Sequence, residues 1–142
     1  MTIYHTSPKE IKEITKNGLF DDCLFFASEP YFMTQAENPI IYSLEIDESE
    51  IIEVSKLYEE NIIKDISNYL EVDLEDAERV LDGRDMAFDY SGDCEDDWYV
   101  QKKQGECAKL MGYRACESID EQGVVYIVPM YSFEDKLVRE SI

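Results

Sequence analysis

Residues 110–128 read LMGYRACESIDEQGVVYIV, and this stretch decides the fold class of the chain. Two runs rich in β-forming residues, YRACESI and VVYIVP, lie on either side of the tetrapeptide DEQG. Such runs, joined by a short turn that contains glycine, predict a β-hairpin with Gly123 in the turn. Because helical patterns precede this hairpin, the sequence indicates an α+β fold.

The segment before the hairpin, DDWYVQKKQGECAKLMGY (96–113), predicts a helix. Asp96 or Asp97 is expected to cap its N-terminus, and Gly112 its C-terminus. Gly105 costs about 1 kcal/mol relative to alanine inside a helix, which indicates close packing at that position. The apolar positions expected on this helix are Trp98, Val100, Ala108 and Leu110.

Upstream of this helix, alternating or fully apolar runs predict three strands. They cover residues 2–6, 22–28 and 40–47. Two helices are expected between these strands, because Pro8 and Ser28 provide favourable helix starts. These helices would cover residues 8–18 and 28–38.

The middle of the chain predicts helices followed by a loop. The apolar spacing in residues 49–84 favours one or two amphipathic helices, with a break near Val72 and Asp73. Residues 82–97, DGRDMAFDYSGDCEDD, predict an acidic loop rich in turn formers. Since no repeat or linker is visible, the 142 residues are expected to form a single domain, 1–142.

The negative charge is concentrated in the middle of the sequence. Residues 21–100 hold four basic and 24 acidic residues, a net charge of −20 that equals the net charge of the whole chain. Such a field repels nucleic acid and membranes and attracts basic partners. A solubilising surface would show the same excess. The alternative is a docking surface, formed by the acidic helical and loop region at about 49–97, for a protein with a basic DNA-binding surface.

The cysteines and the N-terminus restrict the class of protein. Cys23, Cys94, Cys107 and Cys116 form no CxxC pair and have one histidine to join them, so no metal site is expected. Four reduced, mostly buried thiols indicate a reducing compartment. No secretory signal and no apolar run of about 18 residues is visible, so we expect a cytoplasmic protein without membrane contact. The sequence does not reveal the oligomeric state, and a monomer is the default expectation.

The residues able to do chemistry are few. His5 is the only histidine, and the motifs GxSxG, GxGxxG, HExxH and the P-loop are absent. A histidine beside a hydroxyl residue can bind ribose and a carboxamide, and aromatic rings can stack on a flat ring. A carboxylate can stabilise the oxocarbenium-like state that forms when an N-glycosidic bond breaks. This set meets the requirements for using NAD as a donor of ADP-ribose.

The collinear segments YHTS, GLFDDCLFFAS and LMGYRACESIDEQGVVYIV resemble ADP-ribosyltransferase-like proteins of phages, and in particular the type I-F anti-CRISPR ADP-ribosyltransferase family. The resemblance implies an ADP-ribosyltransferase-like split β-sheet, with two packed sheets and flanking helices. It implies transfer of ADP-ribose from NAD to an asparagine of the large, PAM-reading subunit of the type I-F Cascade complex. That modification would block DNA binding in the cytoplasm of an infected bacterial host.

The resemblance also assigns roles in cofactor binding. His5 would contact the adenosine ribose, and Thr6 would hold the nicotinamide carboxamide. Phe25 and Phe26 stand where the second motif of the family usually supplies a tyrosine, so a stacking face is kept and a hydroxyl is lost. The second aromatic face is expected from the following helix, from Tyr31 or Phe32.

The catalytic acid departs from the usual position. In the poly-ADP-ribose polymerase pattern a glutamate directly precedes a YIV-like strand, and Val125 occupies that place here. The resemblance favours Asp120, which matches an aspartate just before the E-x-G turn of the anti-CRISPR family. Glu117 is the second choice, and Glu121 also remains open.

Two other functions stay open beside the transferase. A non-catalytic acidic protein could imitate DNA phosphates and occupy a basic groove without NAD. A toxin of the same fold could consume NAD with water alone. The motifs at the two ends of the chain distinguish an enzyme from a mimic, because mimicry does not require them.

Overall fold

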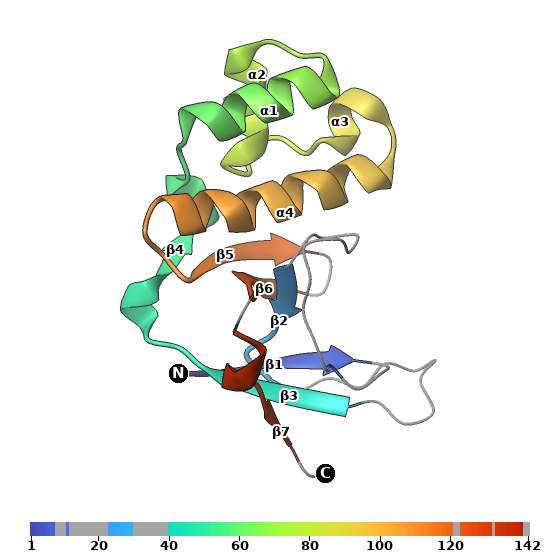
Figure 1. Cartoon of the computed structure of the whole chain (residues 1–142). Coiled ribbons are helices and arrows are strands. Elements are labelled where there is room, and N and C mark those ends of the chain that lie inside the picture. Colours follow the sequence, from blue (N-terminus) through green and yellow to red (C-terminus); the bar gives the residue numbers. More distant parts are fainter. Residues whose placement is uncertain (8–10, 12–22, 30–39, 121–122, 132, 141–142) are drawn as a thin grey trace.

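The computed structural model describes residues 1–7, 11, 23–29, 40–120, 123–131 and 133–140. This part of the chain forms two sheets, with helices over one face of the larger sheet (Figure 1). The strands are β1 (Thr2–Ser7), β2 (Cys23–Phe26), β3 (Ile40–Glu45), β4 (Ile51–Glu53), β5 (Ala115–Asp120), β6 (Gly123–Pro129) and β7 (Val138–Arg139). The helices are α1 (Glu60–Leu70), α2 (Leu74–Leu81), α3 (Phe88–Ser91) and α4 (Cys94–Leu110), with 3₁₀ turns η1 (Glu48–Glu50), η2 (Val54–Lys56) and η3 (Glu134–Lys136).

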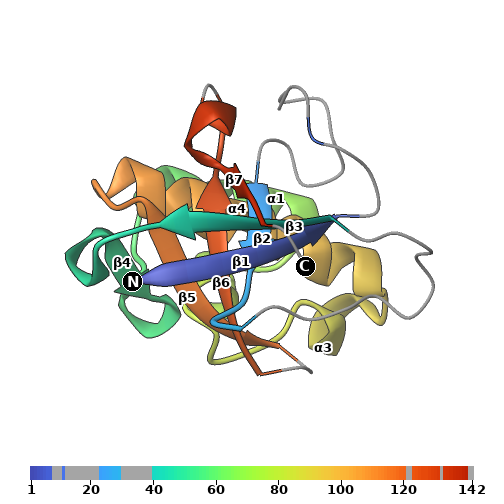
Figure 2. The ribbon, with the colours of Figure 1, turned by 90° about the horizontal axis from the view of Figure 1, so that it is seen from below.

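The two sheets have the strand orders β1-β3-β7 and β2-β6-β5-β4. All described pairings are antiparallel except that of β4 with β5. The strands of one sheet cross those of the other at a steep angle (Figure 2), as in orthogonal sheet packing. Helix α4 lies on the four-stranded sheet, and α1, α2 and α3 lie beyond α4 (Figure 1). The predicted α+β class with two packed sheets is confirmed.

Two hydrophobic cores hold these layers together. The core between the two sheets includes Ile3, Phe26, Leu44, Val128 and Met130. The core between the four-stranded sheet and the helices includes residues from β2, β5, β6 and every helix except α3. Side chains on one face of β2, β5 and β6 therefore pack into one core, and those on the other face pack into the other core. The alternation of side chains along a strand allows this arrangement.

Most strand predictions are confirmed, and the hairpin has the predicted position. β1 extends one residue beyond the predicted strand at 2–6, and the predicted strands at 22–28 and 40–47 contain β2 and β3. β5 pairs with β6 from Cys116–Ile127 to Asp120–Gly123, and Gly123 has φ of +113°. The helices predicted at 8–18 and 28–38 fall outside the described residues, apart from positions 11, 28 and 29.

The predictions for residues 49–97 were wrong at both ends. Ile51–Glu53 forms β4 instead of a helix, because Ile51 pairs with Ala115 far along the chain; the short run IIE fits either structure locally. The break near Val72 and Asp73 is confirmed, since Asp73 caps α2 through its bond to the backbone N–H of Asp76.

The predicted loop at 82–97 contains α3 and the start of α4. Asp93, rather than Asp96 or Asp97, caps α4 by accepting a hydrogen bond from the backbone N–H of Glu95. Asp97 accepts instead from the backbone N–H of Phe88. Several carboxylates in this segment can cap a helix, and tertiary contacts decide which one does.

The burial of α4 differs from its predicted pattern. Val100 and Ala108 are buried, whereas Trp98 and Leu110 are exposed. Cys23, Cys107 and Cys116 are buried thiols, as expected. Burial raises the pKa of Cys107 and of Cys116 to about 12, so both thiols are protonated at neutral pH. Within the described ranges, no helix is long and apolar enough to cross a membrane.

Gly105 lies where α4 approaches the sheet most closely. A Cβ at this position would lie 2.8 Å from Cγ2 of Ile127 and 2.9 Å from Sγ of Cys23. Overpacking of this kind costs about 1–3 kcal/mol, more than the ~1 kcal/mol that alanine gains in helix propensity. We expect Gly105→Ala to lower the free energy of unfolding by about 1–2 kcal/mol in urea denaturation. Lys109→Ala, on the exposed face of the same helix, should change it by less than about 0.5 kcal/mol; equal effects would contradict the close approach.

Candidate active site at the split between the sheets

The two sheets meet at one bridge and then separate. Tyr4 of β1 and Ala27, just after β2, exchange two backbone hydrogen bonds of 2.8 Å. β1 otherwise pairs with β3, and β2 pairs with β6. The backbone groups of alternate residues point to the same side of a strand, so the carbonyl of Phe25 points toward the separating β1.

The side chain of His5 binds the carbonyl of Phe25 at this edge of β2. Its Nδ1 lies 2.8 Å from the carbonyl oxygen of Phe25. A carbonyl oxygen can only accept, so Nδ1 donates, and Nε2 of the neutral ring carries a lone pair. Burial lowers the pKa of His5, and the hydrogen bond to Phe25 opposes this effect only in part. The imidazole is therefore neutral at neutral pH and can accept a hydrogen bond at Nε2.

The aromatic residues after His5 have separate environments. Phe26 is 1% exposed in the core between the sheets, and its ring centroid lies 5.6 Å from that of His5 in a tilted arrangement. Phe25 is half-buried and packs against the core on the helix side. They point to opposite faces, as their adjacency on a strand requires. Phe26 contacts the imidazole in the core between the sheets, and stacking of Phe25 on a ligand stays a prediction.

Of the remaining residues predicted to bind the cofactor, the structure describes only Thr6. Thr6 follows His5 on β1 and is buried at the split, next to the edge that His5 completes. As neighbours on a strand, Thr6 and His5 point to opposite faces, so the role of Thr6 in holding the nicotinamide carboxamide stays a prediction. Tyr31 and Phe32 lie outside the described residues.

A row of side chains crosses the four-stranded sheet from the split. Phe26 pairs with Tyr126, and Tyr126 pairs with Glu117. Paired residues share one face of a sheet, so the three side chains lie on the face that is turned toward the three-stranded sheet. The row connects the environment of His5 with the second candidate acid.

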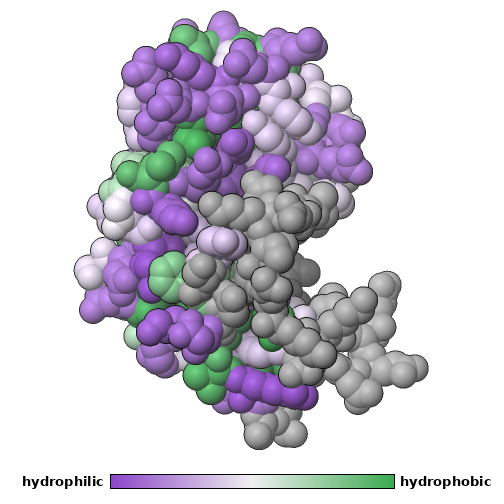
Figure 3. All heavy atoms as spheres, in the orientation of Figure 1, coloured by the Kyte–Doolittle hydropathy of each residue, from purple (hydrophilic) through white to green (hydrophobic). Residues whose placement is uncertain are grey.

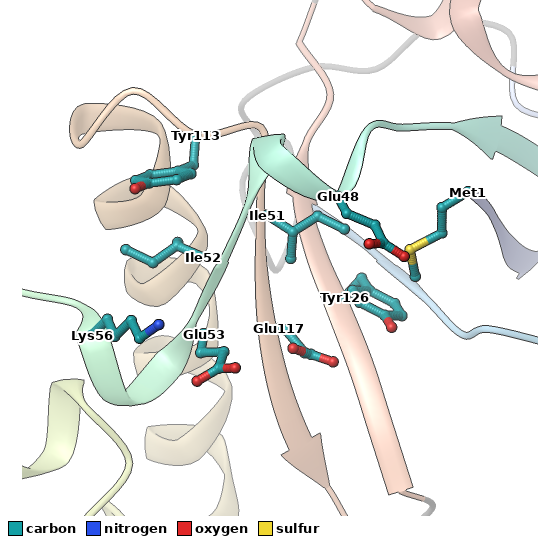
Figure 4. Close-up of a pocket in the computed structure, with 9 residues that line it drawn as sticks. All are labelled: Met1, Glu48, Ile51, Ile52, Glu53, Lys56, Tyr113, Glu117 and Tyr126. Atoms are coloured by element: carbon teal, nitrogen blue, oxygen red, sulfur yellow. The ribbon is translucent and has the colours of Figure 1, made fainter.

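Glu117 lies in a pocket of about 310 Å³ at the far end of this row. Figure 4 shows its carboxylate beside Tyr126, with Glu48 and Glu53 on other walls. Burial, followed by the charge and hydrogen bond of Glu117, raises the pKa of Tyr126. Three carboxylates and Lys56 favour hydroxyl groups or cations over a diphosphate in this pocket.

Asp120 has a different place, at the end of the hairpin. It is the last residue of β5, and Gly123 is its backbone partner. β2 runs antiparallel to β6, so the Tyr4–Ala27 bridge and the hairpin end lie at the same end of the four-stranded sheet. Along β6, Gly123 and the partner of Phe26 are three residues apart, on the order of 10 Å.

The structure thus brings the imidazole of His5 to the backbone carbonyl of Phe25 at the split, with Thr6 next along β1. Glu117 and Asp120 lie three residues apart on β5. Tyr126 lines the pocket of Glu117 and was not singled out in the sequence analysis. The sequence could have indicated this residue, because the hairpin register that pairs Asp120 with Gly123 also pairs Glu117 with Tyr126.

Two sheets that split beside a histidine, with carboxylates on the hairpin strand, define an ADP-ribosyltransferase-like protein. A solved structure described as an anti-CRISPR protein has the same fold, with a TM-score of 0.55 and 24% identity over 100% of this chain and 95% of that chain. The family model of Anti-CRISPR Type I-F ADP-ribosyltransferase AcrIF11 matches residues 1–135, and the chain belongs to this family. The predicted resemblance and ADP-ribosyltransferase activity are confirmed. No curated protein matches the sequence.

Proposed function

We propose that this protein transfers ADP-ribose from NAD to the large, PAM-reading subunit of type I-F Cascade, on an asparagine, and so blocks binding of target DNA. The observation that carries the proposal is the family match over residues 1–135, which spans both His5 and Asp120. The protein would act in the cytoplasm of the infected bacterial host as a monomer of one domain.

The split supports NAD as the donor. The neutral Nε2 of His5 suits a ribose hydroxyl as hydrogen-bond donor, and its ring is held in place by the Phe25 carbonyl and by Phe26. Thr6 would hold the carboxamide of nicotinamide, and Phe25 and Tyr31 would contact its ring. The row from Phe26 to Glu117 leads from this split to carboxylates that favour hydroxyl groups.

In the proposed reaction the bond between C1′ of ribose and the nicotinamide nitrogen breaks, and its electron pair leaves with nicotinamide. Asp120 stabilises the positive charge that develops on the ribose. The side-chain nitrogen of the acceptor asparagine forms the new bond to C1′ and loses a proton to the carboxylate or to water. An amide nitrogen is a weak nucleophile, so positioning must supply much of the rate.

The charge distribution supports a basic target. Hydrophilic side chains cover much of the helical layer (Figure 3), and residues 49–97 belong to the segment that carries the net charge of −20. A surface that binds DNA is basic and would attract this layer. The attraction should weaken as salt screens the charges.

Mass spectrometry of intact subunits tests the proposal directly. After incubation of purified type I-F Cascade with this protein and NAD, we expect the large subunit to gain the mass of one ADP-ribose, and peptide mapping to locate it on an asparagine. No gain in mass, with DNA binding still blocked in the absence of NAD, would favour an acidic mimic. Consumption of NAD without any protein adduct would favour an NAD-hydrolysing toxin.

A further inference from the structure

A second cavity lies on the other face of the hairpin strand, toward the helices. This hairpin groove has a volume of about 230 Å³. The loop before α3, α4 and the end of β5 form its walls, with contributions from Met86, Ala87, Asp97, Gln101, Gln104 and Ile119. Figure 2 shows α3 and the hairpin end on the same side of the molecule. None of the residues assigned to NAD lines this groove.

The lips of the groove are apolar and exposed. Ile119 is 78% exposed and Met86 is 58% exposed. Ile119 stands at the rim of the groove, near the end of β5, and Phe88 in α3 is also exposed. Side chains of this size are favoured at protein interfaces, where burial of their surface stabilises the complex.

Polar groups hold the exposed lip in one conformation. Asp89 accepts a hydrogen bond from the backbone N–H of Met86 at 3.1 Å, and Asp97 accepts from that of Phe88 at 3.1 Å. Asp85 accepts from Arg79 and from the hydroxyl of Tyr90. The backbone of the loop is therefore ordered while its apolar side chains face outward, which lowers the entropic cost of binding.

The charge around the groove determines the kind of partner. Residues 71–97 hold twelve acidic and two basic residues, a net charge of −10. Both basic residues are used internally, since Arg79 pairs with Asp85 and Arg84 pairs with Asp82. Among the described residues, no basic side chain forms an ion pair with Asp97, which lines the groove. A nucleic acid would be repelled here, whereas lysine and arginine would be attracted.

We propose that the hairpin groove receives the acceptor protein, through an apolar side chain flanked by lysine or arginine. Ile119 directly precedes Asp120, so a segment bound over this lip would lie next to the candidate catalytic acid. The inference rests on the proposed transferase function and adds the place where the target docks. It assigns recognition of the target to the groove between the end of β5 and the helices, and binding of NAD to the split.

Charge substitution at the lips tests the inference. Met86→Lys and Ile119→Lys place a cation where a basic segment would bind, and both positions are exposed enough to leave the fold intact. We expect each to weaken binding to purified type I-F Cascade at least tenfold in biolayer interferometry, and to slow ADP-ribosylation in parallel. Leu74→Lys is the matched control, because Leu74 is 54% exposed in the same acidic segment but does not line the groove.

NAD binding, measured by calorimetry in the absence of Cascade, should be the same for Met86→Lys and the parent protein. Unchanged Cascade affinity in both lip variants, with the parent protein active, would overturn the groove inference and leave the transferase function standing. An equal loss in Leu74→Lys would also overturn it in favour of diffuse charge attraction. If the parent protein neither binds nor modifies Cascade, both the proposed function and this inference fail.

Discussion

Replacing Asp120 with asparagine should lower the rate of ADP-ribosyl transfer by about 100- to 1,000-fold. The substitution keeps the size of the side chain and removes the negative charge that would stabilise the oxocarbenium-like state. The backbone pairing of residue 120 with Gly123 does not depend on the carboxylate. The rate is measured by intact mass spectrometry of Cascade at saturating NAD, with thermal unfolding as the check that the fold is retained.

Glu117→Gln is the control for this experiment, because it changes a carboxylate on the same strand. We expect the rate of the variant to stay within about threefold of the parent rate, which corresponds to a change of about half a kcal/mol in the activation free energy. A large loss in Glu117→Gln with an active Asp120→Asn would transfer the catalytic role to the pocket of Glu117 and Tyr126.

The second prediction with a large expected effect concerns His5. Two substitutions separate its hydrogen bond to the Phe25 carbonyl from its proposed hydrogen bond to NAD. His5→Asn keeps a donor for the Phe25 carbonyl but removes the acceptor at Nε2, so we expect KM for NAD to rise about 3- to 10-fold with little loss of stability. His5→Ala removes both bonds and the contact with Phe26. It should raise KM similarly and lower the free energy of unfolding by about 1–3 kcal/mol.

The pH dependence of stability gives His5 an independent readout. Its pKa in the folded protein is lowered by burial, so the unfolded chain takes up a proton first as the pH falls. The contribution of His5 to stability is therefore complete above the unfolded pKa of about 6.5 and decreases below it. The difference in Tm between the parent protein and His5→Ala should shrink on acidification from pH 7.5 to 5.5. A constant difference would show that the imidazole is not held in its neutral form.

Local sequence patterns were sufficient to predict the hairpin and the start of α2. The hairpin at 113–129 follows from two β-forming runs around DEQG, and the α2 start follows from the capping side chain of Asp73. β4 was missed because its three residues become a strand through pairing with Ala115, Cys116 and Glu117. The capping residue of α4 was missed because several carboxylates there are locally equivalent.

For the candidate site too, the sequence indicated the residue types, whereas the structure was needed for their environments. The residue types of His5, Thr6 and Asp120 indicated a chemistry, and the family resemblance gave them roles. Their environments required the fold, since the donor role of Nδ1 depends on a carbonyl 20 positions away in β2. The opposite environments of Phe25 and Phe26 follow from strand alternation, but which face met the core depended on the packing of the sheets.

By itself, the sequence determined the α+β class, the hairpin, the acidic middle and the family, because composition, periodicity and the order of motifs along the chain do not depend on which distant residues make contact. Only the tertiary structure decided that β1 and β2 meet at Tyr4 and Ala27 and then separate, that Glu117 and Tyr126 line one pocket, and that Met86 and Ile119 border one groove. Each of these depends on contacts between residues distant in sequence, whose pairing is determined by the free energy of burying the two cores together.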